Sequence, residues 1–253
     1  MKKLKIGIQL YSLRGEMEKS VENTLRRVSE MGFEFVEFAG YFGKSAEELR
    51  ALLDKYGLEG ASVHQGYDSS TTEEQYKEQI QFLQTLGVKF WGVPCIDISK
   101  LIYYDRLITL TQGFNTLGTW LKRSGMELCY HNHDFELQFH NGKRHLDRML
   151  DTFDRCLVSP EFDVCWLNYG GVNPTDYIRK HGHYSKIIHL QDYKIENNSM
   201  IFTPLGKGVV DFPSIMRAIK DSNIEYLVYE KDDWYEDALQ DAKESIEYLK
   251  SLI

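Results

Sequence analysis

The chain has 253 residues and a formal net charge of −8, from 30 Lys+Arg against 38 Asp+Glu. This excess of acidic residues argues against nucleic acid as the main partner, because phosphate binding needs clustered positive charge. Hydrophobic residues make up 42% of the chain, enough for a core larger than that of a small disulfide-stabilised protein. The longest nearly apolar stretch, residues 90–98, is far shorter than the roughly 20 residues that cross a bilayer.

The N-terminal segment and the cysteines indicate a cellular location. Residues 1–5 are basic, but Gly7 and Gln9 interrupt the apolar run that follows, so we expect no secretory signal. The four cysteines are scattered and include no C-x-x-C pair. We therefore expect a reduced, cytoplasmic protein with neither a membrane nor a nucleic-acid partner.

Short apolar runs alternate with amphipathic stretches along the whole chain. The runs predict strands at residues 5–10, 33–38, 58–64, 88–93, 126–131, 158–163, 186–191 and 224–230. The amphipathic stretches predict helices at residues 21–31, 46–56, 72–86, 104–122, 145–153, 174–181, 212–221 and 237–249. Gly32, Gly57, Gly87 and Gly125 each follow a predicted helix just before a strand, as expected of left-handed helix C-termini.

This alternation predicts an α/β fold. Eight βα units in about 250 residues are typical of a parallel (β/α)8 TIM barrel, and we expect one such domain over residues 1–253. A doubly wound sheet is the alternative, but it would normally carry a glycine-rich phosphate turn after its first strand. Residues 11–14, which follow the first predicted strand, contain no such turn.

Carboxylates and imidazoles close most of the predicted strands, and the active site of such a barrel lies at these strand ends. The residues are Glu37, His64, His131, Asp163, His189 and Glu230. His133 and Glu136 follow in the loop after the fifth strand. Such groups, converging in a half-buried mouth, would repel one another or stay unpaired unless a cation organised them. The pattern therefore favours a catalytic divalent metal site.

Each of these residues also has a purely structural interpretation. A single histidine at a strand end is more often a hydrogen-bonded core residue than a ligand. Asp163 could cap the turn after the sixth strand, and Glu230 could begin the charged run 230–233. Glu37 and His64 could act only as hydrogen-bond partners of residues that contact a ligand.

Two residues outside the strand ends are further candidates. Lys207 lies between Gly206 and Gly208 and could hold a phosphate, but a flexible solvated turn explains it as well. Trp166 follows the end of the sixth predicted strand and could either stack on a ligand or pack against the loop.

Several segments together resemble the sugar phosphate isomerase/epimerase family, whose fold is a xylose-isomerase-like TIM barrel. The segments are GIQLYSLR at 7–14, VEFAGY at 36–41, HNHDFE at 131–136, FDV at 162–164, HLQD at 189–192 and LGKGVVDF at 205–212. They run from the first strand to the last, and the combination of HNHDFE with HLQD is typical of one branch.

The resemblance implies one divalent ion, such as manganese, magnesium, cobalt or zinc, bound by residues of strands five to eight. The implied metal ligands are Glu136, Asp163, His189 and Glu230. His131 is the alternative to Glu136, because it stands where many relatives carry the first glutamate. Gln191 stands where similar sequences often carry lysine, and Lys207 stands where many carry glutamate.

We expect a divalent-metal-dependent isomerase or epimerase of a sugar or keto-sugar that transfers protons through an enediolate. Its expected catalytic residues are Glu136, Glu230 and His131, with the two carboxylates approaching the substrate from opposite faces. Its expected substrate-binding residues are Glu37, His64, His133, Trp166, Gln191 and Lys207. The chain could also form a homo-oligomer.

Three other functions stay open. A dehydratase of an inosose or keto-sugar would share the first proton transfer. Endonuclease-like phosphodiester cleavage would need a basic groove, which the net charge of −8 disfavours. A sugar-binding barrel that has lost its chemistry would bind ligand without turnover.

Overall fold

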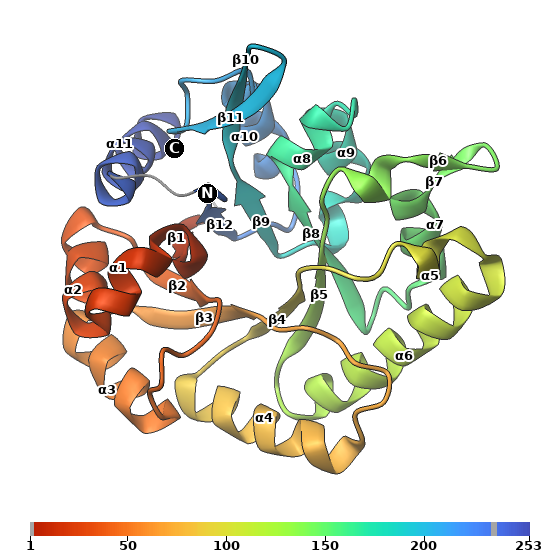
Figure 1. Cartoon of the computed structure of the whole chain (residues 1–253), viewed down its shortest axis with the longest axis horizontal. Helices are drawn as coiled ribbons and strands as arrows, with labels where there is room; N and C mark the ends of the chain where they lie inside the picture. Colours follow the sequence, from red (N-terminus) through yellow and green to blue (C-terminus); the bar gives the residue numbers. More distant parts are fainter. Residues whose placement is uncertain (1–2, 234–236) are drawn as a thin grey trace.

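The computed structural model describes residues 3–233 and 237–253. Eight parallel strands close into a barrel in the order β1-β12-β9-β8-β5-β4-β3-β2 (Figure 1). They are β1 Lys5–Gln9, β2 Phe35–Phe38, β3 Glu59–His64, β4 Phe90–Val93, β5 Glu127–His131, β8 Val158–Asp163, β9 Ile187–Leu190 and β12 Tyr226–Tyr229. Each of these strands lies within one of the predicted ranges, so the predicted (β/α)8 TIM barrel is confirmed.

The main helices surround the barrel (Figure 1). They are α2 Val21–Met31, α3 Ala46–Tyr56, α4 Glu73–Leu86, α6 Tyr104–Arg123, α7 His145–Thr152, α9 Pro174–His181, α10 Phe212–Lys220 and α11 Ala238–Leu252. Their bounds match the predicted helices within three residues at either end. Gly32, Gly57 and Gly87 cap α2, α3 and α4 in the left-handed conformation, as the sequence predicts.

The loops contain shorter elements that the sequence analysis did not predict. They are the helices α1 Arg14–Lys19, α5 Ser99–Ile102 and α8 Val164–Tyr169, the 3-10 turns η1 Leu10–Leu13, η2 Phe135–Leu137 and η3 Gly182–Tyr184, and the hairpins formed by β6 Phe139–His140 with β7 Lys143–Arg144 and by β10 Asp192–Glu196 with β11 Ser199–Thr203. Each spans at most six residues, which is too short for hydrophobic periodicity to be read.

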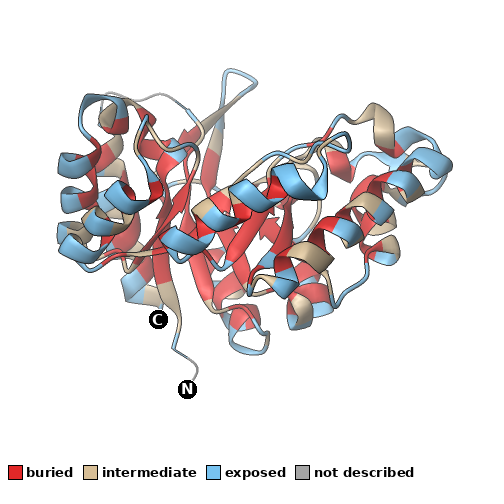
Figure 2. Cartoon of the chain, turned by 90° about the horizontal axis from the view of Figure 1, so that it is seen from below, coloured by how far each residue is buried: buried red, intermediate tan, exposed pale blue. Residues whose placement is uncertain are grey.

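Burial divides the molecule into a buried barrel and helices with exposed outer faces (Figure 2). One cluster inside the barrel is mostly apolar and consists of Phe35, Ala61, Phe90, Cys129, Ile187, Tyr226 and Val228. Toward the carboxyl ends of the strands the interior becomes polar, with Gln9, Glu37, His131, Glu161, Asp163 and His189 all buried. Because buried polar groups are costly without partners, this polar layer is the place to look for a site. Among the described residues, no helix is long and apolar enough to cross a membrane.

Candidate metal centre and active site

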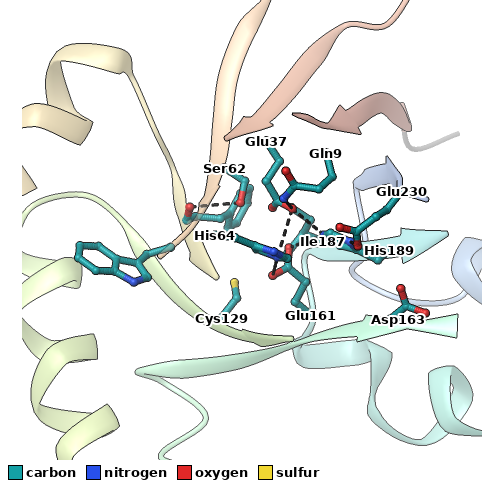
Figure 3. Close-up of polar contacts among 12 residues, drawn as sticks. Gln9, Glu37, Ser62, His64, Cys129, Glu161, Asp163, Ile187, His189 and Glu230 are labelled. Carbon is teal, nitrogen blue, oxygen red and sulfur yellow. Dashed lines mark hydrogen bonds and ion pairs between the residues drawn. The ribbon is translucent and has the colours of Figure 1, made fainter. Parts of the chain in front are cut away.

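His189, on β9, lies at the centre of the polar layer (Figure 3). Its Nδ1 atom is 2.7 Å from Oε2 of Glu230, which directly follows β12. Its Nε2 atom is 2.7 Å from Oε1 of Glu37 on β2 and 3.4 Å from Oε1 of Glu161 on β8. Carboxylates therefore approach this imidazole at both ring nitrogens.

Four buried residues at the strand ends form a group that could hold a metal ion. They are His131, Asp163, His189 and Glu230, each offering one ligand atom within 4.8 Å of the others. Asp163 also caps α8, since its Oδ1 accepts from the Trp166 amide at 2.9 Å. Its Oδ2 accepts from Nε2 of Gln191 at 2.8 Å. Asp163 therefore has the capping role that the sequence offered as an alternative, and it also belongs to the group of candidate metal ligands.

A second group lies beside the first and shares two histidines with it. It consists of His64, His131, Glu161 and His189, again with one ligand atom each within 4.8 Å. His64 stacks nearly parallel on His189, with ring centroids 4.9 Å apart and an interplanar angle of 8°. Its Nε2 lies 3.2 Å from Glu37 Oε1 and 3.3 Å from Glu161 Oε2. Glu37 and His64 therefore contact the candidate ligands themselves, which is the alternative interpretation that the sequence analysis gave for them.

The residues of the first group fit a divalent cation. Two imidazoles and two carboxylates form a mixed nitrogen and oxygen donor set that suits manganese, zinc and similar ions. Within the described part of the chain, the buried atoms Nδ1 of His131 and Oε1 of Gln191 have no hydrogen-bond partner. Buried polar atoms of this kind are normally satisfied, so an additional partner is expected here.

The pKa values of the two shared histidines shift in opposite directions because their neighbours differ. Burial opposes protonation of His189, but Glu37, Glu230 and Glu161 outweigh burial and raise its pKa well above the usual value. Burial lowers the pKa of His131 far below the usual value, and His189 and His64 lower it further. His131 is therefore a neutral imidazole, the form that binds metal.

The structure does not bring Glu136 into either group. Its carboxylate is buried, accepts a hydrogen bond from the Tyr130 hydroxyl, and accepts another from the His133 amide at 2.9 Å. Burial raises the pKa of Glu136 to about 7. These bonds tie the loop after β5 back to the strand. On β5 it is His131, rather than Glu136, that joins Asp163, His189 and Glu230.

His133 and Trp166 flank the group, whereas Gln191 lies within it. The His133 ring centroid is 5.0 Å from that of His131 and 5.4 Å from that of Trp166, and both flanking side chains are half-buried. Gln191 Nε2 donates to Asp163 and lies 3.2 Å from Asp232 Oδ2. Its amide thus links carboxylates on β8 and after β12.

Lys207 lies away from these groups, on an exposed turn. Its ammonium pairs with Glu244 of α11, and the solvated turn is the interpretation that the structure favours. The glycines beside it bind a carboxylate of the chain itself. The amides of Gly206 and Gly208 donate to Asp192 Oδ2 at 3.0 and 2.8 Å, and those of Tyr193 and Val210 donate to Oδ1.

A family model described as xylose isomerase-like TIM barrel matches residues 25–252. The chain belongs to this family.

Two curated proteins and a solved structure resemble this chain over most of its length. An inosose dehydratase of Clostridium perfringens is 27% identical, and the match covers 83% of this chain and 82% of that protein. An inosose dehydratase of Mesomycoplasma hyopneumoniae is 26% identical, with coverage of 100% and 97%. The structure of a sugar phosphate isomerase/epimerase from Parabacteroides distasonis superimposes with a TM-score of 0.84 at 21% identity, covering 99% of this chain and 97% of that one.

The sequence analysis did not identify four residues that lie in the site of this chain. They are Gln9, Asn132, Glu161 and Asp232. Glu161 had a readable signal, because it precedes Asp163 by two residues and therefore lies on the same face of the strand. Gln9 ends β1, as the recognised candidates end other strands. Asp232 lies in a charged run that gives no sign of reaching the site, where its side chain is half-buried.

Proposed function

We propose that this chain is a divalent-metal-dependent isomerase or epimerase of a sugar or keto-sugar. The observation that carries the proposal is the convergence of His131, Asp163, His189 and Glu230 at the carboxyl end of the barrel strands. These four residues would hold the ion, with His131 in the position that the sequence resemblance gives to Glu136. When bound, the ion would polarise a carbonyl and make the neighbouring C–H more acidic.

Proton transfer needs a base near the group, and Glu230 is our proposal for it. Its carboxylate is buried beside His189, and Gln191 Nε2 lies 3.4 Å from Oε2. Burial raises its pKa, but His189 outweighs burial and lowers it, so the carboxylate is ionised and able to accept a proton.

An epimerase also needs a group that returns the proton on the other face. β5 is separated from β12 by β8 and β9 in the barrel, so the loop after β5 lies across the group from Glu230. His133 is on that loop, and burial lowers its pKa, which keeps its ring neutral near pH 7. Its Nδ1 has no hydrogen-bond partner among the described residues. We propose His133 for this role, because both oxygens of Glu136 are already hydrogen-bonded.

Loss of water from an inosose or keto-sugar is a second candidate, favoured by the relatives named inosose dehydratase. It shares the removal of the first proton but then needs a proton for the departing hydroxyl. Burial raises the pKa of Asp163 to about 7 and that of Asp232 to about 8. Asp163 would be deprotonated as a ligand of the ion, so Asp232 is the carboxyl that could hold that proton at neutral pH.

The test is a panel of keto-sugars and inososes incubated with the protein in deuterated water and followed by NMR. We expect manganese-dependent deuterium incorporation next to the carbonyl of at least one substrate, abolished by EDTA and restored by manganese. An epimer or isomer as product supports the first candidate, and an unsaturated or dehydrated product supports the second. If the metal-loaded protein shows neither deuterium incorporation nor turnover with any substrate of the panel, the proposal is contradicted.

A further inference from the structure

A row of aromatic side chains leads from the candidate metal group toward solvent. The ring centroid of His133 is 5.0 Å from that of His131, a member of the group, and 5.4 Å from that of Trp166. The Trp166 centroid is in turn 6.1 Å from that of Tyr169. His131 is buried and His133 and Trp166 are half-buried. Tyr169 is 44% exposed, so the row connects the site with the surface.

The two outer rings of this row are held in place by the β10–β11 hairpin. The Trp166 ring packs edge-on against Phe202 of β11, with centroids 5.6 Å apart and an interplanar angle of 75°. The Tyr169 ring meets that of Tyr193 on β10 at 5.6 Å and 89°. The Tyr193 hydroxyl donates to Asn168 Oδ1 at 2.9 Å. Because both outer rings are already ordered, binding a ligand on them costs little side-chain freedom.

Tyr169 adds a large aromatic surface that the packing of α8 does not use. The residues that bury α8 are Val164, Cys165 and Leu167. A single exposed apolar side chain is common on a protein surface, but one that continues an aromatic row out of a site is typical of a ligand-binding surface. One sugar ring bound at the metal group would contact the inner end of the row. Covering Tyr169 takes a second ring attached to that sugar.

We propose that Trp166 and Tyr169 form a stacking subsite for a second sugar ring, so that the substrate is a glycosylated keto-sugar rather than a free monosaccharide. A pyranose ring has a face of C–H groups, which packs against the face of an aromatic side chain. The inference rests on the proposed function, because the reacting sugar must be bound at the metal group for the second ring to reach α8.

D-fructose, lactulose and isomaltulose are the probes for the experiment, because each of the two disaccharides is a fructose that carries a second pyranose ring. Calorimetric titration of the manganese-loaded wild type should show that at least one disaccharide binds more tightly than fructose by a factor of roughly 3 to 10, the size of one aromatic contact. Tyr169→Ala should remove most of this preference and leave fructose binding unchanged. Tyr169→Phe, which keeps the ring, should retain the preference.

The ratio of the two affinities separates a stacking role from a structural one. Damage to the site in Tyr169→Ala would weaken the binding of fructose and disaccharide alike, whereas loss of stacking weakens only that of the disaccharide. Tyr104→Ala is the matched control, because it removes an exposed tyrosine at the start of α6, outside the row, and should bind all three sugars as wild type does.

Three results would overturn the inference. One is wild type that binds fructose as tightly as both disaccharides, and another is a folded Tyr169→Ala protein that keeps the full preference. Both leave the proposed function intact. The third is metal-loaded wild type that binds none of the three sugars, in which case the deuterium-exchange panel still decides the proposed function separately.

Discussion

Gly92 on β4 leaves the space that the Glu161 carboxylate occupies. A Cβ atom added at Gly92 would overlap Glu161 Oε2 and would lie 2.8 Å from Cδ2 of His64. Real Cβ atoms essentially never approach other heavy atoms so closely. The absence of a side chain on β4 is therefore a condition for the arrangement around His189.

We predict that Gly92→Ala disturbs the polar layer. The added methyl group must displace Glu161 and His64, which should destabilise the protein by about 1–3 kcal/mol, as overpacking does elsewhere, and should weaken metal binding. Denaturant unfolding and metal titration measure the two effects. Gly66→Ala is the control, because a Cβ there meets nothing within 4 Å. Equal behaviour of the two variants would show that the layer adapts to the extra methyl group.

A second prediction separates the two candidate ligands from strand β5. His131→Asn should weaken manganese binding more than Glu136→Gln, because His131 is a member of the group and Glu136 is bonded to Tyr130 and His133 instead. Calorimetric titration of both variants gives the ranking. Stronger loss in Glu136→Gln would restore Glu136 as the ligand, in line with the expectation from the sequence resemblance.

A third prediction tests Glu230 as a base. Glu230→Gln keeps an oxygen for the metal but removes the basic site, so exchange of solvent deuterium into substrate should fall by a factor on the order of 10² or more. The measurement is made at saturating manganese, with bound metal determined in the same sample. If the metal-loaded variant exchanges deuterium at the wild-type rate, Glu230 is a metal ligand and not the base.

A fourth prediction concerns pH and lies outside the site. Burial, with a contribution from Lys180, lowers the pKa of His181 to about 4, and its Nδ1 lies 2.7 Å from the Tyr184 hydroxyl. Between pH 6.5 and 4 the unfolded chain protonates this imidazole while the folded protein does not. Its contribution to stability is therefore present above pH 6.5 and is lost as the pH falls towards 4.

Replacement of this imidazole should flatten that pH dependence. In His181→Gln the free energy of unfolding should vary less between pH 6.5 and 4, by on the order of 1 kcal/mol after allowance for solvent screening next to Lys180. Urea unfolding at a series of pH values measures it, with the exposed His183→Gln as control. If the free energy of unfolding depends on pH equally in wild type and His181→Gln, His181 does not contribute to the loss of stability at acidic pH.

A fifth prediction concerns Asp192, whose two oxygens accept from four backbone amides. Asp192→Asn keeps only one acceptor oxygen, so two of these amides lose their partner and stability should fall by about 2–3 kcal/mol. Hydrogen exchange at Gly206 and Gly208 should speed up, while the exposed Asp221→Asn should change neither quantity. Unchanged exchange at both glycines would show that other contacts hold this turn.

Much of the fold could be predicted because its signals are local. The helix α2 ends where Gly32 takes the left-handed conformation, and the alternation of strand and helix selects the barrel. The barrel topology then brings strand ends together, which is why Asp163, His189 and Glu230 could be grouped from positions far apart in the chain.

The remaining parts of the site depend on contacts that no local pattern encodes. The 3-10 turn Phe135–Leu137 carries Glu136 to Tyr130, its partner on β5. The charged run after β12 gives no indication that Asp232 is half-buried beside Gln191. Glu161 could have been found from its spacing to Asp163, but its contact with His189 arises only from the closed barrel.

The Asp192 carboxylate bears on whether the turn around Lys207 can bind a phosphate group. The glycine-flanked turn at Lys207 does offer converging amide donors of the kind that bind phosphate, but a covalently tethered anion already sits on them. A phosphate group would have to displace the Asp192 carboxylate from these amides. Because this carboxylate belongs to the same chain, its effective concentration at the amides is high, and its negative charge would repel the phosphate. The amide donors of this turn are therefore already occupied by a carboxylate of the chain itself.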